Sequence, residues 1–560
     1  MEPRCWRSGG GLTTPIYDVI QVGYGPVSQA LALMLGRQGR HIAVSERWKT
    51  RYPLPRAVCV DHELYRVLAA NGMSSQLPDI SHVGPRYQWF NAQWKELLVI
   101  DWSAASVSGG SEVNFVHQPT LEEALDAAVA SHSSIETFLG WEAISAEQDA
   151  EFSYVTLRHS ETGETQRLTA RYVVGCDGAN SMVRNAIGSE REDRGFEADW
   201  LVIDVKMKEG VTIEKLGIPA AGQYCNPVRP TTIVPAGVRN GTIYRRWEFM
   251  RLPGEANEEL EKESRVWELL SPWATPDDVE LVRHKVYNFR SLLADRWRDR
   301  RLLIAGDAAH VMPPFMGQGM CSGFRDAWNL AWKLSLILDG KADERLLDTY
   351  QLERMPHVSQ LIDVSIYLGK IICIPDPEAA AERDRAFLSG TASPPPPFPQ
   401  LTVGLLHRDS GGALSAGAGL LAPHVTARRG GTTGRFDDVV GLGFVVISRT
   451  ADPVEILDES AKSALALLPT RYATLGDSAS ASFIEDLDGR LAPFMIAQGW
   501  DVMIVRPDFY VYGGTVNGVG LPDLVLDLVR DLSEAGVRFA RATASKSLVG
   551  ETHEARTISV

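Results

Sequence analysis

The chain has 560 residues, too many for one ordinary hydrophobic core, and its length predicts two or three domains. Hydrophobic residues make up 44% of it and charged residues 23%, and no stretch approaches the roughly 20 apolar residues that a membrane helix needs. The formal net charge is −15, and no basic block could bind a nucleic acid backbone. These features predict a globular protein that acts neither in a membrane nor on nucleic acid.

The six cysteines are scattered along the sequence and form neither a Cys-x-x-Cys pair nor the Cys/His spacing of a zinc site. We therefore expect no metal centre and a reducing, cytoplasmic location. Residues 1–15 carry two arginines and a glycine run but lack the apolar stretch of a secretory signal, so we expect them to form a flexible N-terminal tail.

Residues 16–46 have the pattern of one β–α–β unit, which opens a Rossmann-type domain. Its expected elements are an apolar strand at 16–22, a helix rich in Ala and Leu at 27–38 and a second strand at 41–45. The turn between the first two reads Gly-Tyr-Gly-Pro-Val-Ser at 23–28, and such a turn lets the backbone approach a pyrophosphate at a helix N-terminus. Glu46 ends the second strand, where an acid would accept hydrogen bonds from a ribose.

Aromatic and β-branched runs alternate with Pro and Gly turns in two later segments, 76–111 and 191–287. This pattern predicts an antiparallel sheet inserted into the first domain, which would then consist of residues 16–75, 112–190 and 288–392. Within its last segment we expect a strand at 301–305 and a long helix at 322–338.

The proline-rich segment 393–399 predicts a stiff linker to a separate C-terminal domain, residues 400–560. Strands near 444–447 and 501–505 alternate there with helices near 459–467 and 522–535, which suggests an α/β domain of thioredoxin-like size. It contains no cysteine, which excludes a thiol redox role. We expect it to cap the other domains or to support a homodimer.

Two further apolar strands run into Asp-Gly or Gly-Asp turns, at 171–178 and 301–307, and the second is followed by Pro313-Pro314 and Gly317-Gln318-Gly319. With the first glycine turn, these elements resemble the class A FAD-dependent aromatic hydroxylases, the para-hydroxybenzoate hydroxylase superfamily, over about residues 17–374. The resemblance implies an α/β fold with a Rossmann-type FAD-binding domain, an inserted antiparallel-sheet substrate domain and a C-terminal thioredoxin-like α/β domain.

The resemblance also implies how FAD is held. The carboxylate of Asp307 would bind the ribityl chain, the turn at Asp177 would shape the cleft, and the amides before the long helix would face the flavin. Asp177 could equally form a simple Asx-turn, and Cys321 replaces a frequent asparagine. The candidate cofactor-binding residues are Gly23, Gly25, Pro26, Val27, Glu46, Arg47, Arg56, Gln118, Asp177, Gly306, Asp307, Pro314, Gly317, Gly319 and Met320.

The activity implied is hydroxylation of a phenolic ring with O2 and NADH or NADPH, through a flavin C4a-hydroperoxide. Segments 223–230 and 245–250 resemble the 3-(3-hydroxyphenyl)propionate hydroxylases, although Asn226 stands where those enzymes usually have Asp. This narrower resemblance predicts ortho-hydroxylation of a phenolic acid. The sequence does not choose between the two nicotinamide coenzymes.

The catalytic candidates are Tyr224, Arg245 and His310. Tyr224 would line the substrate site, Arg245 or, as second choice, Arg229 would pair with a substrate carboxylate, and His310 would relay the phenolic proton. The arginines could instead be solvated residues of the sheet, and the histidine could be packed in the core.

Three other functions fit parts of the pattern. A hydroxylase or epoxidase that modifies a larger polyketide or other natural-product phenol would share the same flavin motifs, and a non-catalytic flavin-binding protein would share the same fold. A flavin halogenase is excluded, because the sequence has no Trp-x-Trp-x-Ile-Pro segment.

Overall fold

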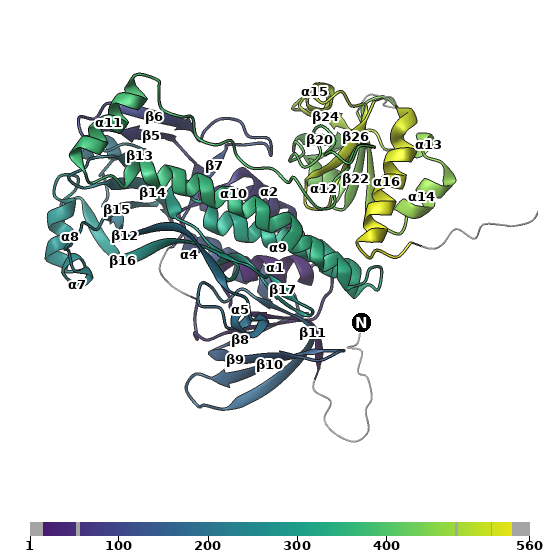
Figure 1. Cartoon of the computed structure of the whole chain (residues 1–560), viewed down its shortest axis with the longest axis horizontal. Helices are drawn as coiled ribbons and strands as arrows, with labels where there is room; N and C mark the ends of the chain where they lie inside the picture. The colour runs from purple at the N-terminus through teal and green to yellow at the C-terminus, as the bar shows by residue number, and fades with distance from the viewer. Residues whose placement is uncertain (1–14, 52–55, 476–479, 517, 540–560) are drawn as a thin grey trace, which may run out of the picture.

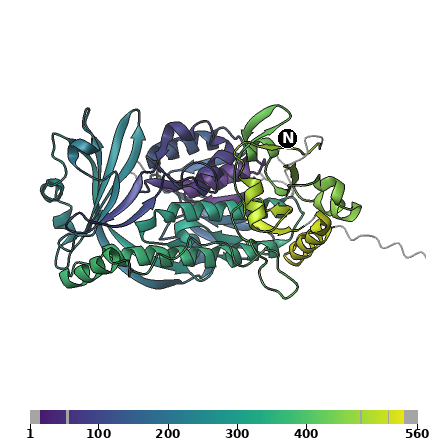
Figure 2. The same ribbon diagram turned by 90° about the horizontal axis from the view of Figure 1, so that it is seen from above.

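The computed structural model describes residues 15–51, 56–475, 480–516 and 518–539. Almost all of the expected N-terminal tail therefore lies outside the described residues. Figure 1 shows a long body of sheets and helices joined by an extended segment to a C-terminal domain, and in Figure 2 a sheet occupies one end of the molecule and the C-terminal domain the other.

The first sheet has the parallel core that the β–α–β pattern predicts. Strand β1 (Ile16–Val22) pairs in parallel with β2 (Ile42–Glu46) on one side and β11 (Thr165–Gly175) on the other, and α1 (Pro26–Gly36) connects β1 to β2. The sheet order is β17-β18-β11-β1-β2-β8, and β10 and β9 extend it from β11. The remaining bounds are Ile135–Leu139 for β8, Trp141–Gln148 for β9, Ser153–His159 for β10, Arg298–Asp299 for β17 and Leu302–Ile304 for β18.

The second sheet combines strands from both expected insertions. Its order is β19-β16-β12-β15-β14-β13-β5-β6, and every pairing is antiparallel except the parallel pair β13–β5, which joins the two segments. Strand β16 continues to Ala294, past the expected end at 287. The bounds are Arg86–Phe90 for β5, Glu96–Asp101 for β6, Arg191–Met207 for β12, Ala221–Tyr224 for β13, Thr231–Arg239 for β14, Thr242–Met250 for β15, Val279–Ala294 for β16 and His310–Val311 for β19.

Both faces of this sheet are covered. Helix α8 (Glu263–Leu270) packs on one face, with Trp247 and Phe249 of β15 in the same buried cluster as Val266 and Leu270 of the helix. On the other face a small sheet, β3-β7-β4, lies between the second sheet and the first domain. Its strands are Cys59–Asp61 for β3, Ser81–Val83 for β4 and Val113–Val116 for β7.

Two long helices run side by side along the body (Figure 1). Helix α9 (Gln318–Leu338) begins four residues before its expected start, because Gly317 adopts a left-handed conformation and starts the helix directly. Helix α10 (Asp348–Ile372) follows it. Within the described ranges no single helix is long and apolar enough to cross a membrane, although one pair bent by 114°, 344–372 with 377–388, meets that test by length and composition.

The C-terminal domain has the expected thioredoxin-like arrangement. Its four-stranded sheet has the order β23-β22-β25-β26, in which β22 and β23 are parallel and β25 and β26 form an antiparallel hairpin. Helices α13 and α14 connect the parallel pair, and α16 follows the hairpin. The bounds are Phe444–Ser448, Thr470–Thr474, Val502–Val505 and Val511–Thr515 for the strands β22, β23, β25 and β26, and Pro453–Ile456, Glu459–Leu465 and Leu521–Glu534 for the helices.

A buried ion network attaches this domain to the long helices. Glu353 of α10 accepts hydrogen bonds from Lys333 Nζ of α9 (2.8 Å) and from both terminal nitrogens of Arg506 (3.0 and 2.7 Å). Arg506 also binds Asp508, whose Oδ2 accepts from Asn329 Nδ2 of α9 at 2.8 Å. Burial opposes ionisation of Glu353, but Arg506 and Lys333 outweigh it and hold its pKa far below the usual range. The C-terminal domain is thus fixed to the helices that bear the flavin motifs.

We predict that Arg506→Met lowers the stability of the protein by about 3–5 kcal/mol, because removing one partner leaves Glu353 and Asp508 as uncompensated buried charges. The matched control is Arg428→Met in the same domain, whose exposed pair with Glu485 contributes about 1 kcal/mol or less. Urea unfolding of the two variants is the measurement. Equal midpoints would show that the network does not anchor the domain.

Candidate cofactor and substrate site

The first glycine turn fits a phosphate group. Gly23 has φ +93°, and a Cβ there would lie 2.5 Å from the carbonyl oxygen of Cys176, so only glycine fits. Gly25 is the N-cap of α1, and no side chain caps the helix, which has Pro26 in its first turn. A Cβ at Gly25 would meet nothing within 4 Å. The first amides of α1 are therefore open to an anion.

Glu46 stands beside this turn. Its Oε2 accepts from the backbone N–H of Tyr24 at 2.9 Å, and its Oε1 accepts from that of Trp48 at 3.1 Å. Each oxygen keeps a further lone pair for a ribose hydroxyl. The neighbouring Arg47 is exposed, with its guanidinium 5.2 Å from the centre of the Trp48 ring.

A second part of the chain meets α1 at Val27. A Cβ on Gly323 of α9 would lie 2.5 Å from Val27 Cγ2 and 3.1 Å from Gly306 Cα, so the two helices and the turn at 306–308 approach without room for a methyl group. Asp307 is exposed, while its neighbours Gly306 and Ala308 are buried. This close packing holds the Asp307 carboxylate at the same edge as the start of α1.

The N-terminus of α9 is also uncapped. Gly317, the N-cap residue, has φ +67° and no side-chain hydrogen bond to the first turn, and a Cβ there would overlap Cys59 Sγ. Pro314, Gly319 and Met320 surround it and are partly exposed. The amides of this turn and the helix dipole can therefore stabilise negative charge on a group placed against them.

Buried contacts orient the first turns of α9. Cys321 is fully buried and its sulfur accepts from the backbone N–H of Asp61 at 3.5 Å, so it takes part in packing where an asparagine was expected. Arg325 binds Asp61 and also Glu63, the latter at 2.5 Å, and Tyr510 of the C-terminal domain donates to Glu63 at 2.9 Å. The C-terminal domain thus contributes to the packing behind the cofactor motif.

His310 lies in the core. Its Nε2 is 2.6 Å from Asp326 Oδ2, and its side chain is inaccessible to solvent. The same carboxylate accepts from the backbone N–H of Gly306 at 3.1 Å and from Arg354 Nε at 3.0 Å. Burial disfavours the charged form of Asp326, but His310 and Arg354 outweigh burial and hold its pKa below the usual value. These contacts give His310 a positioning role and do not support the expected proton relay.

Asp177 lies in a turn, as both the cleft-shaping role and the Asx-turn alternative predicted. Its Oδ2 accepts from the backbone N–H groups of Met182 (2.7 Å) and Val183 (3.3 Å), as in an Asx-turn that starts helix α5 (Met182–Ile187). Its Oδ1 is buried and has no hydrogen bond from the described part of the chain. Burial raises the pKa of this carboxyl above its usual value. The turn packs against Gly23 and so borders the phosphate turn.

Gln118 and Arg56, both cofactor-binding candidates, are in contact. Gln118 Oε1 accepts from the backbone N–H of Arg56 at 2.8 Å and from that of Ala57 at 2.5 Å, and its Nε2 donates to Glu122 at 2.6 Å. The glutamine therefore holds the turn at residues 56–57, called the arginine turn below, in place. Its Oε1 accepts two hydrogen bonds, and its Nε2 keeps one further N–H. Pro55 lies outside the described residues.

The expected substrate residues Tyr224 and Arg245 lie on the outer face of the second sheet. Arg245 and Arg246 are successive residues of β15, so their side chains lie on opposite faces of the sheet. Arg245 donates to the carbonyls of Ala220 (2.7 Å) and Pro219 (2.9 Å). Burial lowers the pKa of Arg245 to about 10. Tyr224 stacks on Trp94 at 4.4 Å. Both therefore face away from the first domain, a correction that follows from strand register.

The second-choice arginine, Arg229, is also engaged elsewhere. It forms a two-pronged ion pair with Glu255, at 2.7 and 2.6 Å, outside the regular strands. Sequence reasoning thus placed its carboxylate anchors at arginines that already have other partners.

The inner face of the sheet carries four charged side chains that the sequence analysis missed. Asp204 of β12 binds Arg246 of β15 through both oxygens (2.7 and 3.2 Å) and Arg283 of β16 (2.6 Å). Glu248 lies two residues beyond Arg246 on the same face. Arg246 also donates to the carbonyl of Arg56 at 2.7 Å, which ties this face to the arginine turn. The charged residues at alternate positions of β15, Arg246 and Glu248, are the sequence signal that could have indicated this charged face.

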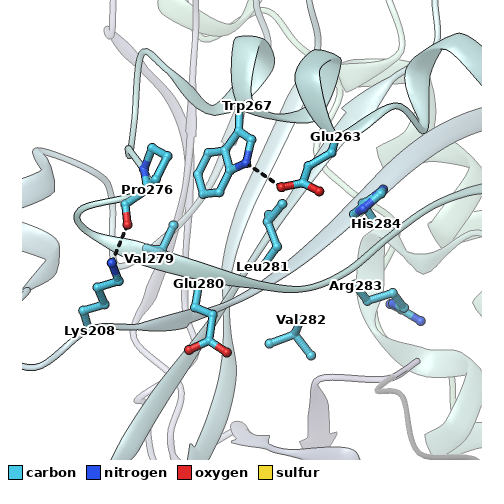
Figure 3. A pocket seen from close by; sticks show the side chains of 10 residues that line it. All are labelled: Lys208, Glu263, Trp267, Pro276, Val279, Glu280, Leu281, Val282, Arg283 and His284. Atoms are coloured by element: carbon cyan, nitrogen blue, oxygen red, sulfur yellow. Dashed lines mark hydrogen bonds between the residues drawn. The ribbon is translucent and has the colours of Figure 1, made fainter.

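A separate hollow of about 590 Å³ lies at the edge of the sheet (Figure 3). In it Trp267 and Glu263 of α8 lie over β16, and Lys208 donates to the carbonyl of Pro276 at 2.6 Å. It includes none of the cofactor-binding candidates. Its full lining is Lys208, Glu263, Trp267, Pro276, Val279, Glu280, Leu281, Val282, Arg283 and His284.

Comparison with known families decides the class. The FAD binding domain family matches residues 16–365, more than half of the chain, and the HcaD C-terminal domain family matches 417–531. The chain belongs to the FAD-dependent aromatic monooxygenases. It binds FAD and uses a reduced nicotinamide coenzyme.

Two relatives are similar along nearly their whole length. A probable NADH-specific resorcinol 4-hydroxylase of Rhodococcus jostii (strain RHA1) is 35% identical over 534 residues, which cover 94% of this chain and 97% of the relative. A 3-(3-hydroxy-phenyl)propionate/3-hydroxycinnamic acid hydroxylase of Comamonas testosteroni is 31% identical, with 88% and 93% covered.

Solved structures share the fold. The flavin-dependent monooxygenase PieE, in complex with FAD and substrate, has a TM-score of 0.75 at 20% identity, and aklavinone-11 hydroxylase, with FAD and aklavinone, has 0.72 at 22%. Each match covers 92% of this chain and 99% of the other.

The residues of this monooxygenase fit FAD. Two uncapped helix N-termini and two carboxylates, Glu46 and Asp307, border one region, as a group with a diphosphate, a ribose and a ribityl chain requires. We predict that Asp307→Ala weakens FAD binding by one to two decades, because a hydrogen bond to a charged group contributes about 1.5–3 kcal/mol.

The control for this prediction is Glu258→Ala, which removes an exposed carboxylate of the sheet domain. Both variants are purified, and the FAD that they retain is titrated by flavin fluorescence. Equal retention by the two variants would contradict the role of Asp307.

Proposed function

We propose that the enzyme hydroxylates a small, uncharged phenol of the resorcinol kind at an ortho position, with NADH as reductant. The charge balance of the inner sheet face carries this proposal. Its two arginines, Arg246 and Arg283, are matched by Asp204 and Glu248. A substrate carboxylate bound there would add a third negative charge to a buried region, which costs several kcal/mol unless it is paired.

The chain's own residues have defined tasks in this reaction. Bound FAD, reduced by NADH, would supply the chemistry that activates O2 for transfer of one of its oxygen atoms to the ring. The amides at the start of α9 would stabilise negative charge on the flavin ring, while Glu46 would hold the ribose and Asp307 the ribityl chain. The inner face of the sheet covers the ring of the substrate and excludes water. Loss of the phenolic proton raises the electron density of the carbons ortho and para to that oxygen.

The Rhodococcus relative, named as a probable NADH-specific resorcinol 4-hydroxylase, supports an uncharged dihydric phenol and NADH. The name of the Comamonas relative favours a phenolic acid, the class that the segments 223–230 and 245–250 predicted. A phenolic acid remains the second candidate. The hypothesis of a natural-product phenol is supported only by solved structures that are less than 25% identical, and such a similarity shows the fold alone.

The same proposal assigns a function to each domain. Residues 16–75, 112–190 and 288–392 would form the FAD-binding domain, and 76–111 with 191–287 would form the substrate domain. Residues 400–560 would stabilise the first domain, with homodimer formation as a further role. Consumption of NADH and five free thiols among the described cysteines are consistent with a cytoplasmic location.

The proposal predicts that resorcinol stimulates NADH oxidation and gives one equivalent of trihydroxybenzene per NADH. 3-(3-Hydroxyphenyl)propionate should be a poorer substrate by at least about tenfold in kcat/KM, since the described arginines of the inner face, Arg246 and Arg283, already have other partners. NADH oxidation and product are measured together for resorcinol, the phenolic acid and a polycyclic phenol, each with NADH and NADPH. Preference for either of the other two phenols, or release of hydrogen peroxide alone, would contradict the proposal.

A further inference from the structure

Glu248 is the least satisfied charge on the inner face of the sheet. It lies on β15, is 6% exposed and has hydrophobic Val202 and polar Thr232 as its cross-strand neighbours. Of the residues that the structure describes, Arg246 alone forms an ion pair with it, at 3.7 Å from Nη1, which exceeds hydrogen-bond distance. No group in the described ranges donates a hydrogen bond to its carboxylate.

The nearby cations are committed to other acceptors. Arg246 directs Nε and Nη2 to Asp204 and Nη1 to the carbonyl of Arg56. Arg283 directs Nη2 to Asp204 and Nη1 to the hydroxyl of Tyr287, at 2.9 Å. Asp204 therefore receives the hydrogen bonds that this face can supply, and Glu248 keeps its acceptor capacity.

An ionised carboxylate buried without hydrogen bonds is costly, so buried polar groups almost always have a partner. Burial raises the pKa of Glu248 above its usual value, and the opposing effect of Arg246 does not cancel this shift. A donor that enters the site with the substrate would supply the missing hydrogen bond. A phenolic hydroxyl has this property, and a carboxylate does not.

Glu248 also lies on the side of the sheet that faces the cofactor. Burial is the main cause of the raised pKa of the Cys59 thiol, and Asp61 and the charge of Glu248 add to it. Burial likewise raises the pKa of the Tyr87 hydroxyl, and the charge of Glu248 adds to that shift. Cys59 packs against Gly317, the residue that starts α9. The carboxylate thus lies between the sheet and the helix N-terminus assigned to the flavin.

We infer that Glu248 is the catalytic base that accepts the phenolic proton of the substrate. The inference rests on the proposed function and names the group that activates its substrate. In the step the phenolic O–H bond breaks and an O–H bond forms on the Glu248 carboxylate, so one negative charge moves from the glutamate to the phenolate. Arg246 then lies beside the phenolate and can stabilise it.

Other candidates suit the role less well. Asp204 already accepts from two arginines, and His310 is enclosed in the core with Asp326. Tyr224 lies on the opposite face of the sheet. Among the titratable side chains described on this face, Glu248 alone combines burial, unused acceptor capacity and proximity to the start of α9.

The test compares Glu248→Gln with the unchanged enzyme, both loaded with FAD, across pH. The charged groups near Glu248 are Arg246, Asp204 and Arg283. The other titratable groups near it are the Cys59 thiol and the Tyr87 hydroxyl, and burial raises the pKa of each, which favours the neutral form. We expect the variant's phenol hydroxylation at neutral pH to fall by about 100-fold or more, the usual contribution of a general base. Activity of the unchanged enzyme should rise as pH increases through the pKa of Glu248, because the base must be ionised. Activity of the variant should rise only near the pKa of the free phenol.

The matched control is Glu280→Gln, which removes an exposed carboxylate from β16, a strand of the same sheet that β12 separates from β15, and should keep the full rate. Glu248→Asp retains the charge and should show an intermediate rate. A Glu248→Gln enzyme with the unchanged rate and pH profile would overturn the inference. So would equal loss of FAD by the Gln and Asp variants, which would indicate a structural role.

The comparison uses whichever phenol the unchanged enzyme hydroxylates. If that phenol is not resorcinol, the proposed substrate class fails, while the ratio between variant and unchanged enzyme still decides the role of Glu248.

Discussion

The carboxylate of Asp326 fixes the part of the structure on which the site depends. It joins His310, Arg354 and the backbone N–H of Gly306 to helix α9 in a fully buried cluster. Because Gly306 precedes Asp307, this cluster fixes the turn proposed to hold the ribityl chain relative to the helix N-terminus proposed to face the flavin. The close contact of Gly323 with Val27 then brings the phosphate turn to the same place. One helix therefore aligns three separate segments of the chain.

The same helix links the cofactor site to the C-terminal domain. Lys333 and Asn329 of α9 share buried partners with Arg506, and Arg325 nearer its start shares Glu63 with Tyr510. Such buried ion pairs add little net stability when complete but are costly to break. The cysteine-free domain thus has a physical role in this fold that needs no redox chemistry.

The sequence was sufficient for the short-range parts of the site. The glycine turn and the strand ends at Glu46 and Asp307 follow from local patterns, and the structure has these elements where they were expected. Which face of the sheet meets the cofactor could not be predicted, because both faces are buried and β15 carries Arg245 and Arg246 side by side. Register against β12 and β14 decides it.

Pairs that are distant along the chain were equally hidden. The sequence could not show that Asp326 would bind His310, nor that Arg506 would reach Glu353, 153 residues earlier. Such contacts depend on how helices pack after the local elements have formed. They place His310 in the core, the alternative that its sequence had left open, and they attach the C-terminal domain to the two long helices.

The proposed substrate site lies on the inner face of the sheet, between Arg246, Glu248 and the start of α9. A crystal structure of the enzyme with FAD and resorcinol tests it most directly. We expect a substrate hydroxyl within about 3.2 Å of a Glu248 oxygen, at hydrogen-bond distance. A ring bound on the outer face, against Tyr224 and Arg245, would contradict it.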